Sequence, residues 1–156
     1  HLAWPSAVDQ HGAMSSHESS ADELSERECW EHLRAEPYGR LAVIGPDGPV
    51  IYPINTVVDH ATIVFRTTEG SKVEAIRADP RVAFEVDGWS PADGIAWSVG
   101  IAGVAHELVG ALEGASAVEL EVTPWQAGPK PIFIRITPHS IAGQRFRRID
   151  RGDDTD

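Results

Sequence analysis

The pattern that constrains this chain most is a series of short runs rich in β-branched and aromatic residues, each ended by glycine, proline or aspartate. Such runs are typical of β-strands, and several of them with few helical segments favour a small antiparallel barrel over a parallel α/β fold. They occupy residues 40–44, 50–58, 62–67, 81–86, 95–109 and 132–136, the last continuing over 140–146. We therefore predict a mainly β fold, a six-stranded antiparallel barrel with flanking helices.

Glycines refine this prediction. Asp47-Gly48, between the first two runs, predicts a β-hairpin. Gly100 and Gly103 lie inside the run 95–109, where glycine indicates a bend at a barrel corner or a close approach of two backbones. A long bent strand of this kind is what a small closed barrel requires.

Two tryptophans lie in segments that we expect to be loops, Trp89 within 87–94 and Trp125 within 123–131. Three interpretations are open for each: a lid over a ligand, part of a subunit contact, or a ring folded back on the core. The sequence does not choose between them.

A capping box predicts the first helix. Ser25 is the expected N-cap and Glu28 the residue that reaches back to it, and the helix should end near Ala35. Three residues should face the barrel, with Trp30 flanking them: Leu24, Cys29 and Leu33. At that position Cys29 is expected to be a small buried hydrophobe rather than a nucleophile. A second short helix is expected at 111–121.

The junction between the strand at 62–67 and the amphipathic segment that starts at Gly70 is the strongest candidate for a binding site. The first turn of a helix has backbone N–H groups without intrahelical partners, and its dipole adds partial positive charge. Arg66 and Lys72 could complete a phosphate site there. The alternative is a plain helix start whose basic residues are solvated, in a domain that serves only protein association.

The segment Phe-Arg-Thr-Thr-Glu-Gly-Ser-Lys at 65–72, followed by Ala-Asp-Pro-Arg-Val-Ala-Phe-Glu-Val at 78–86, resembles the flavin-binding split-barrel family that includes pyridoxamine 5'-phosphate oxidase. The strands at 50–55 and 96–105 also fall where that family has its other characteristic strands. The resemblance extends from about Leu24 to Arg148. It implies a split β-barrel, with FMN as cofactor, and a homodimer with the cofactor between the subunits.

The resemblance also implies a set of cofactor-binding residues. Phosphate contacts carry over to Arg66, Thr67, Thr68, Ser71 and Lys72. The strand that runs along the isoalloxazine ring suggests Pro53, Ile54 and Asn55, and a strand of the second subunit suggests Trp97 and Ser98. Asn55 alone is also open to a structural interpretation, as a buried amide that bridges backbone groups. No catalytic side chain is assigned, and the implied activity is an FMN-dependent oxidoreductase of unknown substrate.

One motif departs from the oxidase itself. Near the C-terminus the oxidase carries Arg-x-His for the substrate phosphate, whereas this chain has Arg145-Phe146-Arg147, which argues against oxidation of vitamin B6. The likeness to small actinobacterial members of the superfamily leaves other ligands open. For the deazaflavin F420 the candidates are Arg145, Arg147 and Arg148, and for haem an axial ligand could be His60 or His106. A dimer without cofactor and without enzymatic activity is the remaining alternative.

Composition limits the partners. A formal net charge of −11 argues against nucleic acid and anionic membranes, because both need clustered Lys and Arg. The single cysteine rules out an internal disulfide and fits a reducing cytoplasm, and no His or Cys spacing indicates a metal. We expect a small-molecule substrate and a cytoplasmic protein.

The 156 residues fit one domain. We expect a disordered lead-in at 1–23, of which 1–13 is foreign to the natural protein because Met14 is the only methionine. The split-barrel domain should span 24–148, and a disordered acidic tail 149–156.

Overall fold

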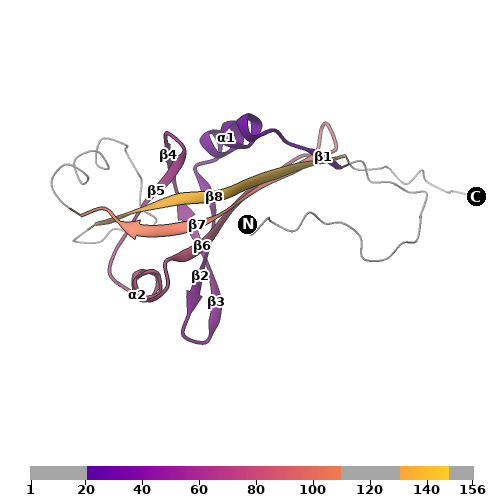
Figure 1. The fold of residues 1–156 in the computed structure, drawn as a ribbon. Helices are drawn as coiled ribbons and strands as arrows, with labels where there is room; N and C mark the ends of the chain where they lie inside the picture. The colour runs from indigo at the N-terminus through magenta and orange to yellow at the C-terminus, as the bar shows by residue number, and fades with distance from the viewer. Residues whose placement is uncertain (1–20, 110–130, 148–156) are drawn as a thin grey trace, which may run out of the picture.

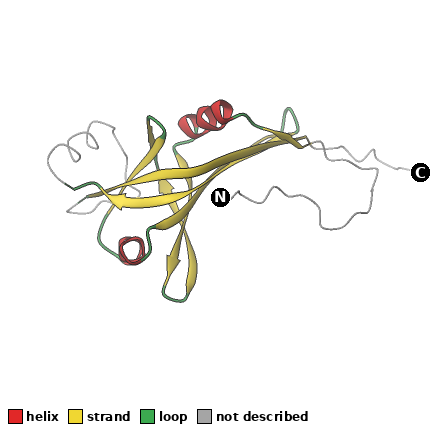
Figure 2. Cartoon of the chain, viewed as in Figure 1, coloured by secondary structure: helices red, strands yellow, loops and turns green. Residues whose placement is uncertain are grey.

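A curled antiparallel sheet makes up most of the protein in this computed structural model, which describes residues 21–109 and 131–147 (Figures 1 and 2). Seven of its eight strands follow the order β3-β2-β6-β7-β8-β5-β4, and β1, the eighth, pairs with β8 outside this path. The strands are β1 (Ala21–Glu23), β2 (Tyr38–Gly45), β3 (Gly48–Asn55), β4 (Val57–Asp59), β5 (Thr62–Thr67), β6 (Arg81–Ser90), β7 (Ile95–Glu107) and β8 (Ile132–Arg147). The prediction of a mainly β, antiparallel split barrel is confirmed.

The strand count differs from the predicted six. The run 50–58 is divided at Thr56 into β3 and β4, because the Thr56 amide leaves the ladder and donates to the Pro37 carbonyl at 2.7 Å. Strand β1 was not predicted; it lies within the expected lead-in and pairs with residues 144–146 of β8. The runs 132–136 and 140–146 form one strand, as predicted.

The loop predicted at 87–94 is wrong over its first half. β6 continues to Ser90 and pairs with β7 as far as Ile95, so that only residues 91–94 form the turn. Gly88 is not a turn residue: a Cβ there would lie 2.5 Å from the indole of Trp97 on the neighbouring strand. Glycine is needed at this position for packing, and Trp89 lies on a strand with its ring half exposed.

The glycine predictions at Asp47-Gly48 and at Gly103 are confirmed. Gly45 pairs with Gly48, so Pro46 and Asp47 form the tip of the predicted hairpin, and Gly48 has a φ of +123°. The β7–β8 ladder shifts register between Ala102 and Gly103. A side chain on Gly103 would collide with the Thr137 carbonyl, which is the close backbone approach that the sequence indicated.

Both helices pack on the sheet and complete the core. Helix α1 (Glu26–Ala35) has the predicted capping box, with the Glu28 amide donating to Ser25 Oγ at 3.2 Å and the Ser25 amide to Glu28 Oε1 at 3.2 Å. Helix α2 (Ser71–Ala78) ends at Asp79, before Pro80. The core includes Leu24, Cys29, Trp30 and Leu33 around α1, Val73 and Ile76 of α2, and Leu41, Phe65, Phe84, Ile101, Ile134 and Ile136 of the sheet.

Burial accounts for both the stability and the chemistry of this core. Each fully buried aliphatic or phenyl side chain contributes about 1.5–3 kcal/mol relative to leaving it in water. Cys29 has no exposed surface, and burial raises the pKa of its thiol, as expected for a packing residue rather than a nucleophile.

Several predictions lie outside the described residues: the helix at 111–121, the loop around Trp125, the first twenty residues and the tail at 149–156. Within the described ranges, neither helix is long and apolar enough to cross a membrane.

Candidate functional site

The backbone amides in the first turn of α2 are not capped by a side chain, so they can donate hydrogen bonds to a group from outside the helix. Strand β5 leads into it through residues 68–70, and Gly70 at the N-cap position makes no side-chain cap. Helix α1, by contrast, caps its own first turn with Ser25. The amides at the start of α2 therefore have no capping side chain and can donate to an anion.

Lys72 places a positive charge beside this turn. Its ammonium lies 5.1 Å from the centroid of the Tyr52 ring, within the range of a cation–π interaction. Among the described residues no carboxylate forms an ion pair with it. The side chain is half-buried, and this burial lowers the pKa of Lys72. A partly desolvated ammonium without a counter-charge favours a nearby anion.

Tyr52 is the site residue that the sequence reasoning missed. Its hydroxyl lies 2.9 Å from Ser71 Oγ, so β3 and the first residue of α2 are joined by a hydrogen bond. Alternation along a strand turns Tyr52 away from the face that Ile51 and Pro53 share. The sequence contained a signal for this role. Tyr52 directly precedes Pro53, which is predicted to lie along the flavin ring, and strand alternation places the Tyr52 side chain on the opposite face from Pro53.

Three more predicted phosphate residues lie on the approach to α2. Arg66 and Thr67 end β5, opposite Phe133 and Ile132 of β8, and all three predicted residues, Thr68 included, are half-buried. Arg66 has no ion pair with any described residue. The structure thus brings Ser71 and Lys72 together with Tyr52, and leaves Arg66, Thr67 and Thr68 in the segment that leads to them.

The predicted ring contacts lie at the end of β3. This strand is terminal in the sheet order, and in the described part of the chain only β2 pairs with it. Ile54 is only 3% exposed and belongs to the core, so it could offer a ligand its main chain alone. Pro53 lies opposite Arg40, and Asn55 opposite Tyr38.

Trp97 and Ser98 lie elsewhere in the single chain. The Trp97 ring stacks on His32 of α1, with ring centroids 3.9 Å apart and planes inclined by 22°, and burial lowers the pKa of His32. Ser98 pairs with Asp87 and Gln144. Helices α1 and α2 are well separated in Figure 1, so the structure does not join these two residues to the site at Lys72.

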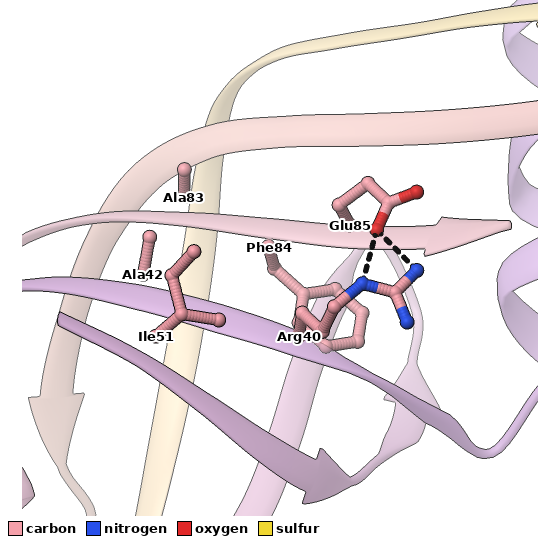
Figure 3. Close-up of a pocket in the computed structure, with 6 residues that line it drawn as sticks. All are labelled: Arg40, Ala42, Ile51, Ala83, Phe84 and Glu85. Atoms are coloured by element: carbon pink, nitrogen blue, oxygen red, sulfur yellow. Dashed lines mark hydrogen bonds and ion pairs between the residues drawn. The ribbon is translucent and has the colours of Figure 1, made fainter.

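A shallow depression of about 170 Å³ lies on another part of the sheet (Figure 3), lined by Arg40, Ala42, Ile51, Ala83, Phe84 and Glu85. Its cation is already paired: Arg40 Nε donates to Glu85 Oε2 at 2.8 Å, and its Nη2 lies 2.8 Å from Asp87. Burial raises the pKa of Glu85, although Arg40 opposes this shift. None of the predicted cofactor residues lines this depression.

The candidates for other ligands are dispersed. The His60 side chain is 95% exposed, with Nδ1 2.9 Å from an Asp59 carboxylate oxygen, and His106 is exposed on β7. Arg145 lies 3.7 Å from Glu28, Arg147 ends β8, and Arg148 is outside the described residues. Within 21–109 and 131–147, no group of three or more His, Cys, Asp or Glu side chains could hold a metal ion.

Fold and site together are those of a split-barrel protein with a cationic helix start. The sequence profile described as pyridoxamine 5'-phosphate oxidase matches residues 25–145, and the chain belongs to that family.

Solved structures support the assignment. A Corynebacterium glutamicum protein, provisionally named a pyridoxamine 5'-phosphate oxidase, is 35% identical with a TM-score of 0.75 over 83% of this chain and 100% of its own. The FAD binding protein from Mycobacterium smegmatis is 34% identical, with a TM-score of 0.68 over 81% of this chain and 98% of its own. An F420 reductase is more distant, at 26% identity and a TM-score of 0.51 over 71% of this chain and 94% of its own.

Proposed function

We propose that this protein binds a flavin nucleotide, FMN in the first place, through its phosphate at the first turn of α2. The observation that carries the proposal is the half-buried Lys72 ammonium, which has no carboxylate partner among the described residues and stands beside an uncapped helix start. A phosphate would supply the missing negative charge and accept hydrogen bonds from the free amides.

The donors present fit such a phosphate. Lys72 and Arg66 would neutralise its charge, while Ser71, Thr67 and Thr68 would donate hydroxyl hydrogens. Tyr52 orients Ser71 through their shared hydrogen bond. Main-chain groups of Pro53, Ile54 and Asn55, on the edge of the sheet, would lie along the ring. A bound flavin supplies hydride chemistry, and the protein supplies position and electrostatics.

The activity we propose is a flavin-dependent oxidoreductase in the cytoplasm, acting on a small molecule. FAD shares the phosphate and the isoalloxazine ring with FMN, and the M. smegmatis relative is named for FAD. F420 is the second candidate, supported by the similarity to an F420 reductase. Haem is less well supported, because His60 and His106 are both exposed.

We propose also that the protein is a homodimer with the flavin between its subunits. One edge of β3 has no strand partner in the described residues, and Ile51 on this strand is 65% exposed. Trp97 and Ser98, distant from Lys72 within one chain, would then contact the flavin held by the partner. A monomer in sedimentation at micromolar concentration would overturn the dimer.

The experiment that tests the function is a titration of the full chain with FMN, FAD, F420 and haemin, followed by absorbance and by flavin fluorescence. Binding of FMN or FAD with a Kd of about 1 μM or below supports the proposal, and the ratio of the two affinities identifies the nucleotide. Preference for F420 or haemin moves the function to those ligands. Binding of none of the four leaves a dimer without cofactor.

A further inference from the structure

Arg77, on the last turn of α2, is bound by two carboxylates at once. Its Nη1 and Nη2 donate to the two oxygens of Glu69 at 2.9 and 2.8 Å, and its Nε donates to Glu107 at the end of β7. This bidentate geometry is the strong form of an Arg–carboxylate contact. The guanidinium therefore lowers the pKa of Glu69 and keeps its carboxylate charged.

The contact between Arg77 and Glu69 matters because Glu69 lies next to the start of α2. Glu69 precedes Gly70, the N-cap residue of α2, and is only three residues before Lys72. An unrestrained carboxylate at this place is attracted by the helix dipole, by the uncapped amides and by the Lys72 ammonium. It would occupy the place that a phosphate needs, or repel a phosphate from it.

We propose that Arg77 is a positioning residue that holds the Glu69 carboxylate away from the first turn of α2 and from Lys72, and so keeps this place open for a phosphate. The proposal rests on the flavin site proposed above. Glu107 binds Nε of Arg77 and so fixes the Arg77 side chain to β7, while the two terminal nitrogens of Arg77 bind Glu69. The anion-binding capacity of the site is thus set by a contact at the far end of the helix.

The alternative is that the Arg77 contacts merely stabilise the local fold. The two explanations differ for the variant Glu69→Gln. A structural contact is weakened by Arg77→Ala and Glu69→Gln alike, so both variants should bind flavin less tightly. If Arg77 instead withholds a competing anion, Glu69→Gln removes the competitor and does no harm. The Arg77–Glu69 pair is exposed on both sides, and exposed ion pairs add little to stability, which favours the second explanation.

The test is a titration of the full chain and its variants with FMN and FAD, with inorganic phosphate as a competitor. Arg77→Ala should weaken flavin binding by about threefold to tenfold, the effect of one charged group near a helix terminus. Glu69→Gln should change it by less than about twofold, and Arg77→Ala with Glu69→Gln should restore it to the Glu69→Gln value. Arg77→Lys should rescue in part. The matched control is Arg81→Ala, which removes an ion pair with Asp79 just beyond the C-terminal end of α2 and should leave binding unchanged.

The outcomes distinguish the role of Arg77 from the existence of the flavin site. Unchanged affinity in Arg77→Ala, or a double variant as weak as Arg77→Ala, overturns the role of Arg77 while the flavin site stands. If the Glu69→Gln variant binds flavin as weakly as the Arg77→Ala variant, the proposed role of Arg77 is likewise overturned. Failure of the wild-type chain to bind FMN or FAD overturns the flavin site, and the role of Arg77 with it.

Discussion

Two half-buried cations of this protein, Arg135 and Lys72, differ in what surrounds them. Arg135 on β8 donates to Asp59 Oδ2 at 2.8 Å and to Thr62 Oγ1 at 2.6 Å, so its charge is matched within the chain. Lys72 lies over a tyrosine ring, with no carboxylate partner among the described residues. Arg135 connects the β4–β5 hairpin to β8, whereas Lys72 forms no ion pair with a described residue.

The difference separates stability from binding. A matched half-buried charge is costly to break, because the remaining partner is left without compensation. An unmatched half-buried charge already carries this desolvation cost in the free protein, and a bound ligand of opposite charge offsets the cost. Substitution of Arg135 should therefore affect folding, and substitution of Lys72 should affect the ligand.

The largest effect is expected for Arg135→Ala. Asp59 would lose its charged donor while only 21% of its side chain is exposed, and the free energy of unfolding should fall by about 2 kcal/mol. Urea denaturation at neutral pH measures this loss. Arg81→Ala is the control, because the Arg81 side chain is 72% exposed and the backbone N–H of residue 81 still donates to Asp79, and it should lose less than about 0.5 kcal/mol. Equal losses for the two variants would show that Arg135 is no different from a surface cation.

The double variant Lys72→Ala with Arg66→Ala should show the opposite behaviour. FMN binding should weaken at least about tenfold, on the order of 1.4 kcal/mol, because charge-assisted phosphate contacts are lost. The free energy of unfolding should stay close to that of the wild type, since neither residue has an ion pair among the described residues. Flavin fluorescence titration gives the affinity, and an unchanged value would contradict the assigned phosphate site.

A smaller effect is expected for Tyr52→Phe, which removes the hydroxyl bonded to Ser71 and keeps the ring beneath Lys72. Loss of one neutral hydrogen bond should cost about 0.5–1 kcal/mol of binding, or about twofold to fivefold in Kd. Ser71→Ala should behave similarly. In a double-mutant cycle the two effects should be less than additive, and strict additivity would mean that Tyr52 does not act through Ser71.

The smallest effect concerns pH. Burial lowers the pKa of Lys72, so its ammonium loses the proton at a lower pH than an exposed lysine does. A flavin phosphate has pKa2 near 6 and remains a dianion in this range. Binding should be constant from about pH 7, where the phosphate is a dianion, up to the lowered pKa of free Lys72, and should weaken as the pH rises through that pKa, by about twofold to threefold at first. Lys72→Arg should remove this dependence, and its persistence there would assign the titration to another group.

Local sequence patterns predicted most of the fold. The capping box of Ser25 and Glu28 and the hairpin at Asp47-Gly48 are encoded within a few residues, and both form as expected. Gly88 shows the limit of this reasoning. It lies in the segment 87–94 that the sequence predicts to be a loop, yet glycine is required there by the Trp97 indole on the next strand, a contact that no local pattern records.

The site was predictable to a similar extent. The strand-to-helix junction and its basic residues could be recognised, because they are contiguous in the sequence. The contact of Tyr52 with Ser71 and Lys72 joins residues about twenty positions apart, and so depends on how β3 and α2 pack. The contact of Arg77 with Glu69, on which the proposed role of Arg77 rests, joins the last turn of α2 to the residue before its N-cap and is equally invisible in the sequence.

Strand β8 has a consequence for how the protein is made. Although its residues, Ile132–Arg147, come late in the chain, they pair with β1, β5 and β7 and bring Ile134 and Ile136 into the core. During synthesis on the ribosome, the edges of β5 and β7 that pair with β8 therefore stay open until β8, the last of the described strands, has emerged. Pairings between such distant residues make folding slow, and the waiting edges are vulnerable to aggregation.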